Sequence, residues 1–138
     1  MNGFLIRTKN NQIIRFRFYI DAAPITSAAF LKALPLSRNF FHARVSGQEI
    51  WIDDVPSLNI IQENSSVFAE PGEIVIGPAS PARNKIANCM GIFYGEGRLL
   101  DAGNIFGKVV DEDLNLLKTL GDIIWRQGGQ ELTFEEME

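Results

Sequence analysis

The stretch that decides the fold spans residues 40–53, FFHARVSGQEIWID, and reads as two β-strands joined through Ser46 and Gly47. Successive side chains of a strand point to opposite faces, so alternation between apolar and polar residues indicates a half-buried strand. A two-residue loop would place Arg44 opposite Glu49 across the hairpin. We therefore predict a hairpin with two unlike faces.

The two predicted faces differ in composition. The first is apolar and suits a core, with Phe41, Ala43, Val45, Ile50 and Ile52. The second places charged groups among aromatic rings, with Phe40, His42, Arg44, Glu49, Trp51 and Asp53. A face that is merely solvated more often carries Lys, Glu, Thr and Ser. We therefore expect function on the polar-aromatic face.

Working outward, short strands and two helices are predicted on either side of this hairpin. The strands are expected at residues 4–7, 12–19, 58–61, 73–76, 88–94 and 104–110, with a turn at 95–97 and a last hairpin at 123–125 and 130–134. A first helix is expected after Asp21, with Pro24 in its first turn, and stops before Pro35. A second helix opens at the acidic residues 111–113 and ends at Gly121.

About eight short strands and two helices far apart in sequence predict a mainly β fold. Such a pattern favours a closed or nearly closed β-barrel capped by the helices. We expect one domain over residues 1–138, with a frayed tail at about 135–138.

Composition excludes several classes of protein. The 138 residues are 46% hydrophobic with ten Phe, and the formal charge of −4 argues against nucleic-acid binding, which needs a clustered basic surface. The single cysteine, Cys89, permits no disulfide framework. No run approaches the roughly 20 apolar residues of a membrane span. The first ten residues lack a secretory pattern, so we expect a cytoplasmic protein that does not bind membranes.

Residues 104–121, NIFGKVVDEDLNLLKTLG, resemble the cyclophilin superfamily, in which a strand with an FGKV element leads through an acidic turn into a helix. Three further segments follow in matching order, namely APIT at 23–26 with Phe30, FHARV at 41–45 and GIFY at 91–94. The resemblance implies an eight-stranded barrel capped by two helices. It also implies that residues 41–45 form the strand that carries the superfamily's catalytic arginine.

Two departures from the prolyl isomerases of this superfamily bear on function. Those enzymes have the arginine directly after the histidine, whereas Ala43 separates His42 from Arg44 here. Their tryptophan and histidine ahead of the FGKV element are replaced by a segment that ends in AGNI at 102–105. In these respects the chain is similar to small bacterial cyclophilin-like proteins of unknown function. Domains of this fold also occur in bacterial enzymes that hydrolyse amides such as allophanate and 5-oxoproline.

Arg44 is the candidate catalytic residue, because a guanidinium donates paired hydrogen bonds to a carboxylate or to a peptide carbonyl. Its alternative role is a cross-strand ion pair with Glu49, a second candidate ligand-binding residue. Trp51 either walls a pocket or covers His42. His42 is the only histidine, so any histidine-based catalysis must use it.

Three more residues are candidate ligand contacts. Tyr94 either places a hydroxyl at the groove or packs in the core, and Arg83 either reaches over the pocket rim or is solvated. Asn104 lies where the superfamily brings groups to its groove. No metal or cofactor is expected, because one histidine with Glu49 and Asp53 is a weak ligand set.

Three functions remain open at this point. The first is a scaffold or enzyme that binds a small molecule or peptide at the Arg44 and Trp51 face. The second is a divergent peptidyl-prolyl isomerase, and the third is a non-catalytic subunit, with a homodimer as one form of assembly. A closed pocket lined by Arg44, Glu49 and Trp51 would favour the first, and a proline-sized apolar pocket beside Arg44 the second. A flat apolar patch would favour the third.

Overall fold

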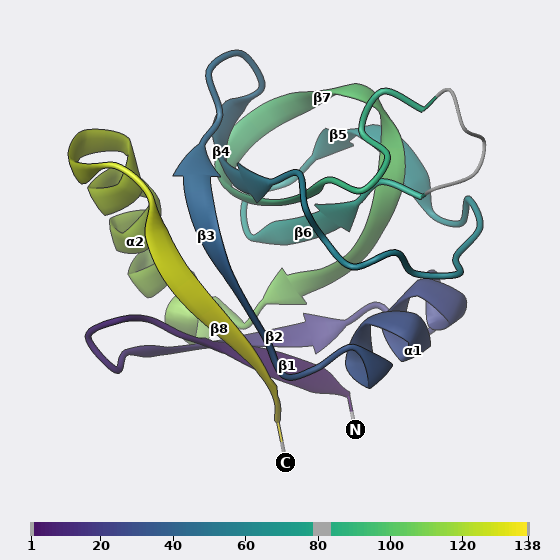
Figure 1. Cartoon of the computed structure of the whole chain (residues 1–138), viewed down its shortest axis with the longest axis horizontal. Helices are drawn as coiled ribbons and strands as arrows, with labels where there is room; N and C mark the ends of the chain where they lie inside the picture. Colours follow the sequence, from purple (N-terminus) through teal and green to yellow (C-terminus); the bar gives the residue numbers. More distant parts are fainter. Residues whose placement is uncertain (1, 79–83, 138) are drawn as a thin grey trace.

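The structure, a computed structural model, describes residues 2–78 and 84–137. Within them the chain forms eight strands, two α-helices and one 3-10 helix (Figure 1). The strands are β1 (Gly3–Arg7), β2 (Ile13–Phe18), β3 (Leu36–His42), β4 (Gly47–Ile52), β5 (Ser65–Ala69), β6 (Glu73–Ile76), β7 (Met90–Val109) and β8 (Gln130–Glu136). The helices are α1 (Pro24–Lys32), η1 (Asp111–Asp113) and α2 (Leu114–Gln127).

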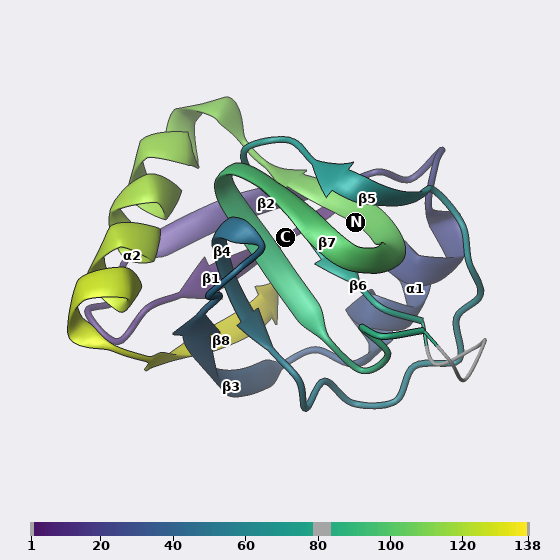
Figure 2. The ribbon, with the colours of Figure 1, turned by 90° about the horizontal axis from the view of Figure 1, so that it is seen from above.

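Six of the strands close into a barrel. The hydrogen-bonded order is β2-β1-β8-β3-β4-β7, and the C-terminal end of β7 pairs back with β2. Strand β7 is long and curls back on itself (Figure 2), so that β6 lies between its two ends, with Ile74 opposite both Ile92 and Gly107. Strand β5 pairs with the middle of β7. The predicted cyclophilin-like fold, a mainly β barrel of about eight strands capped by two helices, is confirmed.

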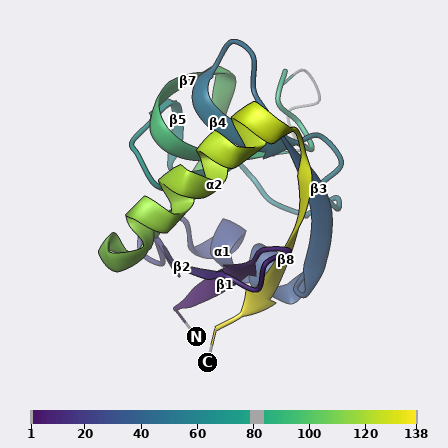
Figure 3. The same ribbon diagram turned by 90° about the vertical axis from the view of Figure 1, so that its left-hand side faces the viewer.

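The two helices lie at opposite openings of the barrel, with α2 across one and α1 at the other (Figure 3). Both contribute to the core, α1 through Phe30 and α2 through Leu117, Leu120 and Ile124. Seven phenylalanines are fully buried, namely Phe4, Phe16, Phe30, Phe40, Phe93, Phe106 and Phe134. Stacked and edge-on rings such as Phe4 with Phe16 and Phe30 fill the barrel. No helix of the described residues is long and apolar enough to cross a membrane.

Several predicted elements were wrong in detail. Residues 58–61 form no strand, whereas β5, which was not predicted, begins at Ser65. The expected turn at 95–97 lies inside β7, and residues 123–125 belong to α2, which continues through Gly121 to Gln127. Strand β8 extends through Glu136 and pairs with β1, and the Glu135 side chain forms an ion pair with Arg7 of β1.

The β3–β4 hairpin differs from its prediction by one residue of register. Phe41 faces Trp51 and His42 faces Ile50, and residues 43–46 form a four-residue connection in place of a two-residue loop. A shift of one residue moves a strand's side chains to the other face. Phe40 is therefore fully buried, and Phe41, predicted for the core, is 54% exposed.

Candidate functional site

The corrected register brings an acidic and two aromatic side chains onto one face. Glu49 and Trp51 alternate along β4 and so point to the same side. Phe41 is paired with Trp51, and the backbone N–H of Ala43 donates to the carbonyl of Glu49 at 2.9 Å. The face predicted to carry function is thus retained on β4, but on β3 Phe41 takes the place expected for His42.

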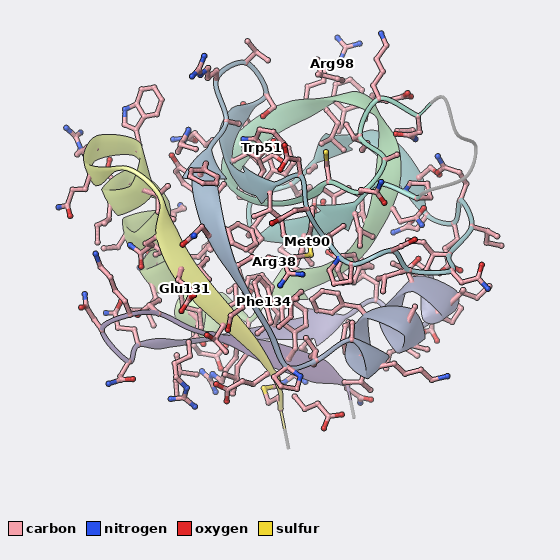
Figure 4. The ribbon with its side chains drawn as sticks, viewed as in Figure 1. Arg38, Trp51, Met90, Arg98, Glu131 and Phe134 are labelled. Carbon is pink, nitrogen blue, oxygen red and sulfur yellow. The ribbon has the colours of Figure 1, made fainter. Side chains whose placement is uncertain are left out.

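This face forms one wall of a cavity of about 720 Å³. Trp51 lies where β4 pairs with the start of β7 (Figure 4); it faces Gly91 there, and both residues line the cavity. The remaining walls are mainly apolar and are formed by Phe41, Val75, Ile86, Leu99 and Leu100. Such a concave, mostly apolar space with a few polar groups is typical of small-molecule sites.

Glu49 lines this cavity and is buried, with 6% exposure. Burial raises the pKa of Glu49 to about 7, although a hydrogen bond from Ser46 Oγ to Oε1 at 2.5 Å acts in the opposite direction. Among the described residues no Lys, Arg or His forms an ion pair with this carboxylate. The expected alternative for Arg44, an ion pair with Glu49, is therefore not formed there.

Arg44 lies in the connection after β3, where its exposed side chain lines the cavity. Exposed Lys85 and Asp53 also line it, so the cavity wall carries charges of both signs. Cys89, which falls in the strand expected at 88–94, is half-buried and lines the cavity as well. Burial raises the pKa of its thiol, and the negative charges of Asp53 and Glu49 raise it further.

His42 and Tyr94 form a separate polar pair toward α2. His42 Nδ1 lies 2.7 Å from the carbonyl of Ala43, which can only accept, so Nδ1 carries the proton. In the neutral ring Nε2 then accepts from the Tyr94 hydroxyl at 2.6 Å. Burial raises the pKa of Tyr94, and Asp122 raises it further. This pair borders a second hollow of about 790 Å³ that also contacts Trp125.

Asn104 lines neither hollow, and its hydrogen bonds join β7 to α1 and to residues 61–63. Its fully buried side chain donates to Thr26 Oγ1 at 3.1 Å and to the Ile61 carbonyl at 2.7 Å, and it accepts from the Glu63 N–H at 2.9 Å. The structure thus gives Asn104 a packing role and does not bring it to the cavity. Arg83, another predicted ligand contact, lies outside the described residues.

Sequence reasoning missed the apolar part of the site. A two-residue loop assigns Phe41 to the core, and the buried strand expected at 88–94 includes Cys89. Leu99 and Leu100 were not predicted as site residues, because the expected turn at 95–97 interrupts the strand that contains them. The signal for Phe41 was Phe40 beside it, since either of two adjacent phenylalanines can occupy the core position. In the described parts of the chain, no cluster of three or more His, Cys, Asp or Glu side chains could hold a metal.

Solved structures share this fold at low sequence identity. McbB, solved in complex with tryptophan, matches with a TM-score of 0.73 and 14% identity over 96% of this chain and 44% of McbB. The hypothetical protein AF2241 from Archaeoglobus fulgidus matches at 0.66 and 20% identity, over 99% and 95% of the two chains. The chain spans less than half the length of McbB. These likenesses establish the fold alone.

A cyclophilin-type peptidyl-prolyl cis-trans isomerase of Cryptosporidium parvum, solved in the presence of the dipeptide Ala-Pro, matches with a TM-score of 0.62. The identity is 17%, over 99% of each chain. A comparison with curated proteins finds no match. A family model described as "Protein of unknown function (DUF3830)" matches residues 8–136.

Proposed function

Since the chain belongs to the DUF3830 family of unknown function, we propose a role from the site itself, namely binding of a small molecule in the cavity beside Glu49 and Trp51. The observation that carries the proposal is a buried carboxyl group, without an ion-pair partner among residues 2–78 and 84–137, in a largely apolar cavity of about 720 Å³. A group with a strongly shifted pKa inside a cleft is a candidate functional residue. Arg44 and Trp51, both candidate ligand contacts from the sequence, line this cavity.

The cavity fits the small-molecule hypothesis better than the two alternatives. Arg44, Glu49 and Trp51 line one cavity together, which is the arrangement expected for a small ligand. Phe41 and Leu100, exposed by 54% and 67%, belong to the cavity wall and could close over a bound apolar group. Tryptophan, which McbB was solved with, is a rational first probe.

Tryptophan fluorescence offers a direct test, because the chain has two tryptophans. Trp125→Phe leaves Trp51 as the only indole, and Trp51→Phe leaves Trp125, which is 60% exposed on α2. We would titrate both variants with small amines, amides and carboxylates that lack an indole, and follow tryptophan itself by calorimetry. A ligand in the cavity should change emission only when Trp51 is present.

Alkylation of the only cysteine gives an independent readout. Cys89 lines the cavity, so a bound ligand should slow its reaction with N-ethylmaleimide. A ligand that binds without changing Trp51 emission and without protecting Cys89 must lie elsewhere, and this result would overturn the proposal.

Arg44 at an apolar cavity favours prolyl isomerisation as a second candidate. A guanidinium near the prolyl nitrogen would stabilise the twisted amide, and the uncatalysed barrier of about 18–20 kcal/mol makes catalysis easy to detect. Arg44 lies beyond the end of β3, however, and not within the strand. A protease-coupled assay on X-Pro peptides tests this candidate. Catalysis should be lost in Arg44→Ala and kept in Arg17→Ala, whose exposed side chain is on β2; no rate enhancement in the parent protein rejects it.

A further inference from the structure

We infer that the cavity selects a ligand with a protonated amine on an apolar or aromatic body, with the amine at Glu49 and the body against Trp51 and Phe41. This inference rests on the proposed function and names the class of ligand for that site. It is carried by the position of the carboxylate, by the rings beside it and by the charges around it.

The carboxylate of Glu49 has bonding capacity that the described residues do not use. Ser46 Oγ donates to Oε1. In residues 2–78 and 84–137 no donor contacts Oε2, which lies over the backbone of Gly91. A carboxylate accepts several hydrogen bonds, so Glu49, which lines the cavity, can accept a further one from a bound ligand. A ligand ammonium would supply both the missing donor and the missing positive charge.

The rings beside the carboxylate suit the rest of such a ligand. Trp51 follows Glu49 by two residues on the same strand face, a separation of about 7 Å along the strand. Phe41 is paired with Trp51 across the hairpin, and both residues line the cavity. Aromatic faces attract cations as well as apolar groups. A ligand whose amine lies two carbons from an aromatic ring would therefore contact the Glu49 carboxylate and the aromatic side chains together.

The charged groups around Glu49 come from four segments. His42 ends β3, and Arg44 lies in the connection between β3 and β4. Asp53 follows β4, and Lys85 and Cys89 lie in the connection between β6 and β7. Arg44, Asp53 and Lys85 are exposed and screened by water, whereas Glu49 is buried. The buried carboxylate is thus the group that decides which ligand charge is favoured.

The affinity of the cavity for such an amine should depend on pH in a defined direction. A primary alkylamine, like the lysine ammonium with a pKa of about 10.4, stays protonated through neutral pH. Its binding then requires ionised Glu49, whose pKa burial raises to about 7. Affinity should rise about tenfold between about pH 6 and pH 8, as the ionised fraction of such a group does. A ligand carboxylate should show the opposite trend, and a neutral ligand little change.

Three compounds with one phenyl body separate these cases, namely 2-phenylethylamine, 2-phenylethanol and phenylacetate. We would titrate each into the Trp125→Phe protein across this pH range and follow Trp51 emission and Cys89 alkylation. The amine is expected to bind tightest above neutral pH. Glu49→Gln, which keeps the shape and removes the charge, should abolish the preference for the amine and its pH dependence.

The outcomes distinguish the two claims. If the alcohol or the acid binds at Trp51 as tightly as the amine, the cavity is a ligand site and only the inference about the amine is overturned. If the amine binds equally well to Glu49→Gln, the carboxylate is not its partner, and the inference is again wrong. If none of the three compounds affects Trp51 or Cys89 while the protein remains folded, both the inference and the proposed site for this class of ligand fail.

Discussion

Gly91 decides where the Glu49 carboxylate can lie. Gly91 faces Trp51 in the β4–β7 ladder, and a Cβ at residue 91 would overlap Oε2 of Glu49. The carboxylate therefore occupies space that any other residue at this position would fill. A glycine inside a strand often marks such a close approach. Burial of this acid, and with it the raised pKa, depends on a missing side chain on the neighbouring strand.

Gly91→Ala should displace the carboxylate and leave the barrel folded, because the overlapping atom is the free end of a flexible side chain. A carboxylate moved toward water loses the burial that raises its pKa. Binding of 2-phenylethylamine should weaken about tenfold, equivalent to about 1.4 kcal/mol, and lose its pH dependence near neutrality. Fluorescence titration in the Trp125→Phe background measures both. Adding Gly91→Ala to Glu49→Gln should weaken binding of the amine little further. An unchanged pH profile of binding in Gly91→Ala alone would contradict this account.

Helix α2 depends on a second glycine of the same kind. Gly121 was predicted to end the helix, but it lies in the helix interior. The position needs glycine because a Cβ there would overlap the ring of Tyr94. Tyr94 in turn donates to His42, so α2, β7 and β3 meet at this point. Gly128, with a φ of 95°, follows the last helical residue and has the left-handed backbone that glycine favours at a helix end.

Gly121→Ala should therefore destabilise the protein, although alanine is favoured over glycine in helix interiors by about 1 kcal/mol. Overlap with a packed ring typically costs about 1–3 kcal/mol, and neither the helix backbone nor the buried ring can move freely. Urea unfolding measures the change in the free energy of unfolding. In a Tyr94→Ala background the same substitution should become neutral or stabilising. Equal destabilisation in both backgrounds would show that the ring is not the cause.

The elements that the sequence predicted well are those with a local signal. Alternation predicts β2, and the FGKV element before an acidic turn predicts the end of β7 and the start of α2. Register has no such signal in the β3–β4 hairpin, because Phe40 and Phe41 are both apolar and Ser46-Gly47 also fits inside a longer loop. Glu49 and Trp51 therefore share a face of β4 as predicted, whereas the side chains of β3 are shifted by one residue. The Gly91 and Gly121 contacts involve residues far apart in sequence, which local patterns do not encode.

Across the whole molecule, two groups of acids give stability opposite dependences on pH. Hydrogen bonds from Arg15 and from Arg7 hold the pKa values of Asp113 and Glu135 below their ordinary values, and hydrogen bonds from the backbone N–H groups of Lys85 and Ala102 do the same for Asp101. Stability from these acids is present at neutral pH and is lost as the pH falls through their lowered pKa values. The pKa of Glu49 is raised, so its contribution to stability is lost as the pH rises. The two effects together favour a maximum of stability at mildly acidic pH.

The contribution of Glu49 can be isolated by comparing the parent protein with Glu49→Gln. Its pKa is about 7 in the folded protein against a reference of 4.5, so between these values the unfolded chain releases a proton that the folded protein retains. The free energy of unfolding should therefore fall by up to about 3 kcal/mol as the pH rises through this interval, from about 1.36 kcal/mol per pKa unit. Glu49→Gln should lack this decline and gain stability relative to the parent protein as the pH rises. Urea unfolding of both proteins between about pH 5 and pH 8 measures the difference. A difference that stays constant with pH would mean that Glu49 titrates as an ordinary exposed acid, and the cavity would then hold a permanently charged carboxylate at neutral pH.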